Sequence, residues 1–387
     1  MKVLVNALSA RKGGIVTYTR NLLEALENRG IDVVVSVPEE FDTPDRASVN
    51  RMEITGYSPF RRFLWEQTTW RGIVKRHNPD ILFSSANFGL LRSPVKQILL
   101  LREGGLFDPF YLANMTATQG VWHAFNRYFR RKLMLLSALS ADHIITPTKT
   151  MSDMVAHWEP SILQKCSINP YGTINEIFTP STRKRNWRED GTVRLLYVSV
   201  YYPHKVPNVI CRAVQQLIDI GIDAHATITM SLGEFDEMNG SALDKAVVTD
   251  AHERGLITLG HHSYEDLPEL YGSHDVFVFP SVSETFGHPM AEALSSGLPT
   301  IASDTLVNRE ICGDTALYFE PFLAKRLVEQ LQKLDREPEL RKMNSENGRQ
   351  RAVEKFGWND HVDRLVETFE KVVSGRAETG TARVTAP

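Results

Sequence analysis

The sequence predicts an α/β protein with two doubly wound domains, each a parallel sheet covered by helices on both faces. The 387 residues are too many for one ordinary hydrophobic core. Short apolar runs typical of strands alternate with segments of helical periodicity, which is the pattern of a parallel α/β sheet. The alternation lapses once, between about residues 171 and 191, and then resumes.

The first half opens with a strand–helix–strand unit. The apolar run "KVLVN" precedes a helix in which Ile15, Tyr18 and Leu22 fall on one face, and Gly30 ends that helix. "IDVVVSV" follows as the second strand. Further strands are expected at residues 80–85, 96–101 and 141–148.

The second half repeats the alternation after a polar, proline-containing linker. It begins at "VRLLYVSV" (193–200) and continues through "AHATITM", "GLITLG", "DVFVFPS" and "PTIAS". These segments predict domains over residues 1–175 and 190–356. A helix within 357–375 is expected to pack back toward the first domain, and 376–387 to form a flexible tail.

Charge differs between the halves although the net charge is only −3. Residues 1–175 contain 21 Lys and Arg against 15 Asp and Glu, whereas the remainder contains 23 against 32. A basic first half favours an anionic partner or membrane surface, and scattered surface charge is the alternative. The near-neutral total and the lack of an aromatic–basic platform argue against nucleic acid.

Cysteine use and hydropathy predict a cytoplasmic protein. Cys166, Cys211 and Cys312 show neither metal-ligand nor disulfide spacing, which fits a reducing compartment. The first apolar run is too short for a signal peptide, and no stretch approaches the roughly 20 apolar residues of a membrane span.

Phosphate-binding features cluster in "FPSVSETFGHPMAEALSSGLPTIASD" (279–304). The loop "VSETFGH" follows a buried strand, at the edge where open α/β sheets bind ligands. Pro289 suits the first turn of a helix and Gly297 its end. The free N–H groups at such a helix start favour an anion, and Gly287 lets a phosphate approach the backbone.

Two carboxylates flank this helix start. Glu284 comes from the loop and Glu292 lies one turn into the helix. Together with the phosphate site they favour a ligand with an anionic centre and hydroxyl-rich ends, such as a nucleotide sugar. The alternative is a solvated Glu284 and a Glu292 that interacts with the helix dipole.

The same stretch resembles the Glu-x7-Glu signature of the retaining GT-B glycosyltransferases of family 4. The resemblance continues in "GGIVTYTRNLLEAL", "WEQTTWRGIVKRHNPDILFSSAN", "ADHIITPTKTMSDMV", "INPYGTINEIFTP", "LYVSVYYPHKVPN", "NREICGDTALYFEP" and "FGW". It implies a GT-B fold, in which two Rossmann-like domains face each other across a cleft. It also implies donor binding in the second domain and acceptor binding in the first.

The resemblance implies a role for each matching residue. Glu292 would accept hydrogen bonds from the ribose hydroxyls, and Glu284 would lie near the hydroxyls of the donor sugar. Lys205 would neutralise the diphosphate. The remaining matches would place backbone near the donor; they are Phe286 and Gly287, with Gly13 and Gly14 from the other domain.

Two departures from the family pattern concern charge. Val200 stands where relatives often have an arginine, so His204 or another cation would have to compensate. Arg102 and Glu103 replace a His-Asp pair on the acceptor side, as either a salt-bridged structural pair or a catalytic one. His123 is a further acceptor-side candidate.

A basic cluster in the first half is a candidate for contact with an anionic bilayer or a lipid-diphosphate acceptor. The alternative is an ordinary helix with a solvated face. The cluster comprises Arg61, Arg62, Arg127, Arg130, Arg131 and Lys132.

These observations predict a retaining glycosyltransferase that moves a sugar from a nucleotide-diphosphate sugar to an acceptor hydroxyl, in surface polysaccharide or glycolipid assembly. We expect no metal and no cofactor, with Glu284 and Lys205 as catalytic residues. A non-hydrolysing nucleotide-sugar 2-epimerase and a non-catalytic nucleotide-sugar sensor are alternatives. An oxidoreductase is disfavoured because neither half has G-x-G-x-x-G after its first strand.

Overall fold

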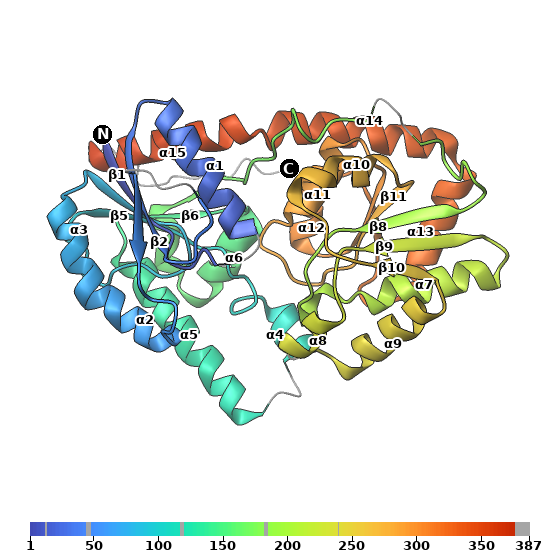
Figure 1. The fold of residues 1–387 in the computed structure, drawn as a ribbon, viewed down its shortest axis with the longest axis horizontal. Coiled ribbons are helices and arrows are strands. Elements are labelled where there is room, and N and C mark those ends of the chain that lie inside the picture. The colour runs from blue at the N-terminus through green and yellow to red at the C-terminus, as the bar shows by residue number, and fades with distance from the viewer. Residues whose placement is uncertain (12–13, 44–47, 117–119, 182–184, 239, 376–387) are drawn as a thin grey trace. The chain divides into compact units, whose positions relative to one another are not determined.

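A computed structural model describes residues 1–11, 14–43, 48–116, 120–181, 185–238 and 240–375. The chain divides into two compact units (Figure 1). Unit 1 comprises Met1–Phe107, Gln119–Pro170 and Asn359–Pro387. Unit 2 comprises Asp108–Thr118 and Tyr171–Trp358.

In its described residues, unit 1 contains a seven-stranded parallel sheet in the order β3-β2-β1-β4-β5-β6-β7. Its strands are β1 (Lys2–Asn6), β2 (Asp32–Pro38), β3 (Val49–Met52), β4 (Ile81–Ser84), β5 (Lys96–Leu100), β6 (His143–Thr146) and β7 (Cys166–Ile168). Its helices are α1 (Gly14–Asn28), α2 (Pro59–Trp65), the π-helix η1 (Glu66–Trp70), α3 (Arg71–His77), α5 (Val121–Ser140), α6 (Lys149–Trp158), the 3-10 helix η2 (Pro160–Lys165) and α15 (Trp358–Val373).

The strands of unit 1 are apolar on both faces because helices cover both. Figure 1 shows α1 and α15 on one side of the sheet and α2, α3 and α5 on the other. Leu4 and Leu82, which lie side by side in β1 and β4, pack in one cluster with Val74 of α3. Phe83 points to the opposite face, where its ring lies 5.4 Å from that of Phe369 in α15.

In its described residues, unit 2 contains a six-stranded parallel sheet in the order β10-β9-β8-β11-β12-β13. Its strands are β8 (Val193–Tyr197), β9 (Ala224–Ile228), β10 (Ile257–Leu259), β11 (Val276–Phe279), β12 (Thr300–Ser303) and β13 (Leu317–Phe319). Its α-helices are α4 (Pro109–Met115), α7 (Asn208–Asp219), α8 (Gly233–Glu237), α9 (Ala242–Glu253), α10 (Leu267–Gly272), α11 (His288–Ser295), α12 (Leu306–Cys312), α13 (Ala324–Arg336) and α14 (Pro338–Lys355), and its 3-10 helices are η3 (Pro203–Lys205) and η4 (Tyr264–Asp266).

The strand order of both sheets confirms the predicted doubly wound α/β class. In each sheet the chain reverses direction across the sheet between two adjacent central strands, β1 and β4 in unit 1 and β8 and β11 in unit 2. Ligands of open α/β sheets bind outside the carboxyl ends of such a strand pair. In unit 2, the loops after β8 and β11 are therefore where a ligand is expected to bind.

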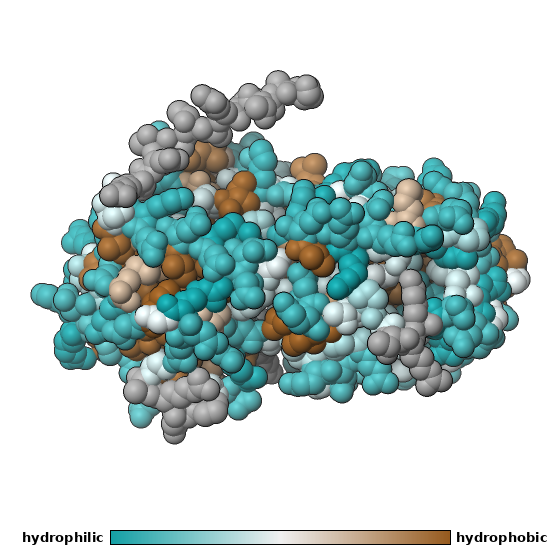
Figure 2. Space-filling model, turned by 90° about the horizontal axis from the view of Figure 1, so that it is seen from above, coloured by the Kyte–Doolittle hydropathy of each residue, from teal (hydrophilic) through white to brown (hydrophobic). Residues whose placement is uncertain are grey.

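The surface shown in Figure 2 is mostly hydrophilic, with apolar residues in small separate groups. None of the helices within the described residues combines the length and the apolar composition needed to cross a membrane.

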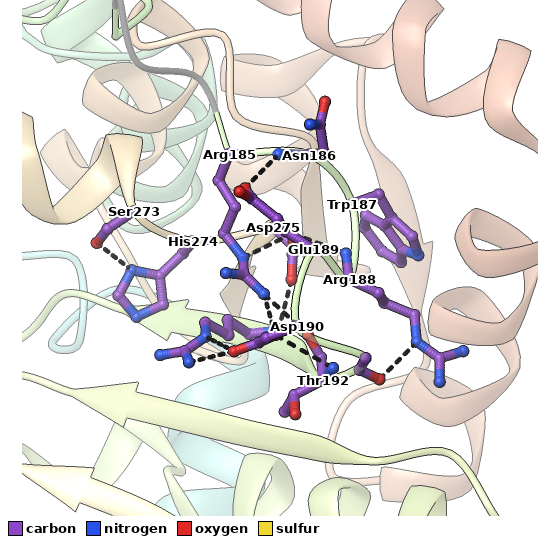
Figure 3. A network of polar contacts seen from close by, with 12 residues as sticks. Arg185, Asn186, Trp187, Arg188, Glu189, Asp190, Thr192, Ser273, His274 and Asp275 are labelled. Atoms are coloured by element: carbon purple, nitrogen blue, oxygen red, sulfur yellow. Dashed lines mark hydrogen bonds and ion pairs between the residues drawn. The ribbon is translucent and has the colours of Figure 1, made fainter.

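The predicted linker belongs to unit 2, and its described residues from Arg185 onward pack against the sheet (Figure 3). Asp275, just before β11, accepts hydrogen bonds from the amides of Arg188 and Arg194 (3.3 and 2.8 Å) and from Arg185 Nε (3.3 Å). Asp190 forms ion pairs with Arg185 and Arg194. These contacts fasten the segment to the edge of the sheet at the amino end of β11.

The compact units differ from the expected boundaries at 175 and 190. Unit 2 already begins at Tyr171 because the buried rings of Tyr171 and Phe178 pack against rings of its core. It also takes Asp108–Thr118 from the first half of the chain, whereas α15 from Asn359 onward belongs to unit 1. The expected tail, 376–387, lies outside the described residues.

Candidate functional site

The loops after β8 and β11 bring Lys205 and Glu284 together in unit 2. Lys205 Nζ lies 2.6 Å from Glu284 Oε1, and the two side chains are 13% and 12% exposed. The hydroxyl of buried Tyr197 donates to the backbone oxygen of Lys205 (3.0 Å), which fixes the first loop to the sheet. Two residues 79 positions apart thus form one largely buried ion pair.

This ion pair keeps Glu284 charged. Burial opposes ionisation of its carboxyl group, yet Lys205 and His204 together hold its pKa below the usual value. Burial lowers the pKa of His204 to about 4, and the charge of Lys205 acts in the same direction. His204 is therefore neutral at pH 7 and does not replace the arginine that is absent at Val200.

Helix α11 begins four residues after Glu284, and a glycine is its N-cap residue. Gly287 is the N-cap residue with φ +82°, a conformation that favours glycine. Pro289 lies in the first turn, and Gly297, with φ +68°, follows the helix as predicted. Phe286 is buried against Tyr171, and only 1% of this residue is exposed.

Glu292 lies one turn into α11 and is only 8% exposed. Tyr271 of α10 donates its hydroxyl to Oε2 of this carboxylate at 2.9 Å. Burial raises the pKa of Glu292 to about 7, and the hydrogen bond from Tyr271 opposes this only in part. An ionised Glu292 has further acceptor lone pairs for hydroxyl donors.

Asp108 is a residue of this region that the sequence did not indicate. Its carboxylate caps α4 by accepting from the amides of Phe110 (2.9 Å) and Tyr111 (3.3 Å), and it also accepts from Ser283 Oγ (2.7 Å). The ring of Tyr111 lies 6.0 Å from that of His204. Helix α4 is thereby joined to both loops that carry the Lys205–Glu284 pair.

The "DP" at 108–109 is an ordinary helix-start signal, so the sequence could have predicted α4. Its attachment to unit 2 depends on contacts across 175 positions of the chain, between Asp108 and Ser283. No local pattern reports such a contact. The same holds for Tyr271, the partner of Glu292.

The remaining predicted site residues belong to unit 1. Gly13 lies outside the described residues, and Gly14 is the exposed first residue of α1. Glu103 forms an ion pair with Arg130 (2.8 Å), and the amide of Arg102 donates to Asn87 Oδ1 (2.7 Å).

His123 lies on the exposed first turn of α5. In the middle of this helix, Arg131 of the basic cluster has a packing role. Its guanidinium lies 3.4 Å from the ring centroid of Trp158 and donates to the backbone of Leu106.

A cavity of about 380 Å³ lies at the opposite edge of the unit 2 sheet from the Lys205–Glu284 pair. Its lining includes Asp275 and Pro299, which precede β11 and β12, and Arg185 of the network in Figure 3. The amino ends of parallel strands are not where open α/β sheets bind their ligands. The carboxyl edge therefore remains the candidate site.

Comparisons with known proteins concern the family and the fold. The family described as Glycosyl transferases group 1 matches residues 179–351, and Glycosyltransferase Family 4 matches 12–164. The O-antigen chain mannosyltransferase RfbU of Salmonella typhimurium (strain LT2) is 28% identical over 200 residues, which cover 50% of this chain and 51% of that protein. The chain spans about half, or less, of the length of the first curated relatives that it matches.

Two solved structures show the same fold over nearly the whole chain. Sucrose-phosphate synthase from Thermosynechococcus elongatus has a TM-score of 0.78 at 16% identity and covers 97% of this chain and 100% of that one. Anabaena HepE in complex with UDP-glucose has a TM-score of 0.73 at 14% identity, with coverage of 96% and 100%. The two family matches span both halves of the sequence, and the fold agrees with them. The chain belongs to glycosyltransferase family 4 and has the GT-B fold.

Proposed function

We propose that this protein transfers a sugar from a nucleoside-diphosphate sugar to an acceptor hydroxyl with retention of configuration, in surface polysaccharide or glycolipid assembly. The proposal rests on the Lys205–Glu284 pair beside the start of α11, at the carboxyl edge of the unit 2 sheet. A relative named as an O-antigen chain mannosyltransferase and a neighbour in complex with UDP-glucose support it.

Charge on the departing diphosphate is stabilised in this proposal by Lys205 and by the N–H groups of α11. An ammonium group has three N–H donors, so Lys205 can bind a phosphate oxygen while it keeps Glu284 as a partner. The N–H groups of the first turn, after the N-cap residue Gly287, are the donors offered to the phosphate. Preorganised donors of this kind stabilise charge that develops in the transition state.

In this proposal, the two glutamates contact different parts of the donor, the sugar and the ribose. Glu284, held ionised by Lys205, faces the sugar and stabilises positive character at the ring. Glu292, which is buried and accepts a hydrogen bond from Tyr271, also accepts hydrogen bonds from the ribose hydroxyls. Substitution Glu284→Gln is expected to lower kcat by ~10²–10³, a loss typical of one electrostatic group. The reaction as proposed uses neither a metal nor a cofactor.

The proposed acceptor is a saccharide or a lipid-linked saccharide, bound by unit 1 with Arg102, Glu103 and His123 as the candidate contacts. Gly13 and Gly14 belong instead to the donor step, where they approach the diphosphate. We extend the proposal to peripheral contact with an anionic membrane on its cytoplasmic side. The exposed basic residues of α5 support it, because each Lys or Arg near such a surface contributes ~1 kcal/mol.

Product analysis tests the proposal. The full chain is incubated with UDP-, GDP-, ADP- and dTDP-sugars, with and without a phospholipid extract that contains lipid-linked saccharides. Acceptor-dependent release of the nucleoside diphosphate, with the donor anomer preserved in the product by NMR, supports it, and addition of EDTA tests the expected independence of metal. An isomerised donor would identify an epimerase instead. Donor binding without turnover would identify a sensor. The sensor is kept as an alternative because Val200 replaces the arginine of relatives and the neutral His204 does not supply the missing charge.

A further inference from the structure

An aromatic groove lies between α2 and α5 in unit 1. Its volume is about 580 Å³, within the range of small-molecule sites. The apolar side chains of its lining are Pro59, Phe60, Phe63, Phe88, Phe129 and Leu133. Such an apolar hollow is suited to a hydrocarbon chain rather than to a sugar.

The aromatic surface continues from the groove along α5. The ring of Phe129 lies 6.4 Å from those of both Phe60 and Phe125, and the ring of Phe125 lies 5.8 Å from that of Trp122. Phe60, Phe125 and Trp122 are 56%, 55% and 69% exposed. Figure 1 shows this first part of α5 extending beyond α2. Contiguous exposed aromatic rings mark a surface that binds an apolar partner.

Two arginines line the same groove. Arg62 lies 3.1 Å from Glu66 Oε1, and Arg130 lies 2.8 Å from Glu103 Oε2. Burial raises the pKa of both carboxyl groups. The side chains of Arg62 and Arg130 are 23% and 53% exposed, whereas their partners Glu66, which also lines the groove, and Glu103 are 7% and 29% exposed, so each guanidinium is more accessible than its carboxylate partner. Each guanidinium has five N–H donors and keeps several for an anion.

We propose that the α2–α5 groove binds the hydrocarbon chain of a lipid phosphate or diphosphate that carries the acceptor sugar, with Arg62 and Arg130 at the phosphate. This inference rests on the proposed transferase function and specifies its acceptor class. Charge complementarity favours this occupant, because a single molecule with an anionic head and an apolar chain matches the arginines and the aromatic rings together.

Monomeric alkyl phosphates test the groove directly. Octyl, decyl and dodecyl phosphate, each below its micelle concentration, are titrated into the full chain by calorimetry. Burial of each added methylene is expected to tighten binding about fourfold, which corresponds to roughly 0.8 kcal/mol. Neutral alkyl glucosides of the same chain lengths are expected to bind at least tenfold more weakly.

Matched variants locate the binding. Phe129→Gln is expected to abolish the dependence on chain length, whereas Leu139→Gln, at an equally exposed position of α5 (42% for both), is expected to preserve it. Arg130→Gln is expected to abolish the preference for phosphate over glucoside. Lys132→Gln, which removes a charge from the same helix outside the groove lining, is expected to retain it.

Equal behaviour of the Phe129 and Leu139 variants would overturn the proposal. So would association with anionic vesicles without any binding of monomeric alkyl phosphate, since that would make this face a bilayer contact. Failure of the transferase function itself is a separate observation. In that case, the unsubstituted protein releases no nucleoside diphosphate from any donor, whatever the groove binds.

Discussion

At the scale of single residues, the Lys205–Glu284 pair contributes both to the stability of the fold and to the proposed catalysis. Both side chains are nearly buried and 2.6 Å apart, so removal of either one leaves a charge without its partner. Breaking a buried pair typically costs 3–5 kcal/mol, whereas replacing both members is far less costly. A single substitution therefore mixes a folding defect with a catalytic one.

A double substitution separates the two effects. Lys205→Met is expected to lower the free energy of unfolding by ~3 kcal/mol, and Lys205→Met with Glu284→Gln to recover most of that loss. Both variants are expected to bind a nucleoside diphosphate at least tenfold more weakly, because both lack the ammonium group. Urea unfolding and calorimetry measure the two quantities. A Lys205→Met variant as stable as the unsubstituted protein would show that the ion pair is absent in solution.

Glu292 makes stability and donor affinity depend on pH in opposite directions. Its pKa rises from 4.5 in the unfolded chain to about 7 in the folded one, so the folded state binds more protons in this range. Stability therefore falls as pH rises from about 4.5 to 7, by about 3 kcal/mol in total. Ribose hydroxyls favour the ionised form, so donor affinity is expected to rise over pH 6–8.

Glu292→Gln tests whether Glu292 causes the opposite pH dependences of stability and donor affinity. The substitution is expected to raise the free energy of unfolding at pH 8 by ~1–3 kcal/mol and to change it little at pH 4.5. Donor KM should increase, and the pH dependence that comes from residue 292 should disappear, with saturated kcat less affected. Tyr271→Phe is the control, since it removes the hydrogen bond to the carboxylate and leaves the charge. Equal stability of the glutamine variant at both pH values would contradict a buried, titrating Glu292.

The sequence located these residues but not their partners. Lys205 and Glu284 each follow a central strand, so a doubly wound sheet alone places both at one edge. Whether two long side chains meet there depends on the exact course of two irregular loops, which no spacing rule encodes. His204 shows the same limit, because its neutrality results from burial rather than from its position after Pro203.

At the scale of elements, α4 is the part of unit 2 that comes from the first half of the chain. Asp108 caps this helix and accepts from Ser283 of the loop that carries Glu284. The ring of Phe110 stacks 6.1 Å from that of Phe322, a second attachment to unit 2. Helix α4 therefore supports the shape of the candidate site from outside it.

Asp108→Ala is expected to cost ~1–2 kcal/mol of stability, because it removes a helix cap and a buried hydrogen bond. It should also lower kcat several-fold, since the loop from Ser281 to Gly287 loses a fixed contact. Asp108→Asn retains the cap through its amide oxygen but presents an NH2 donor to Ser283 in place of the second carboxylate oxygen, so it should recover most of the stability and less of the kcat. Urea unfolding and initial rates at saturating donor give the comparison. An alanine variant with normal kcat would limit α4 to a structural role.

At the scale of the whole molecule, the two units are not two successive halves of the sequence. Helix α15, which ends at Val373, completes the core of unit 1, where Val362, Leu365, Phe369 and Val372 are buried. Alternating strands and helices predicted both sheets, because each βα repeat is encoded locally. The exchange of α4 and α15 between the halves depends on which apolar face each helix covers, and periodicity alone does not specify that.

Deletion of residues 359–387 tests this arrangement. The four buried side chains each contribute roughly 1.5–3 kcal/mol, so their loss is comparable to the entire stability of an ordinary domain. The deletion also removes His361, whose Nδ1 donates to Pro170 O (2.8 Å) and whose Nε2 accepts from Tyr18 (3.1 Å). We expect unit 1 to lose amide protection in hydrogen exchange, while unit 2, which contains Lys205, Glu284 and α11, still binds a nucleoside diphosphate. Deletion of 376–387 alone serves as the control and should leave both properties unchanged. If the longer deletion melts like the full chain, α15 is an appendage of unit 1 rather than part of its core.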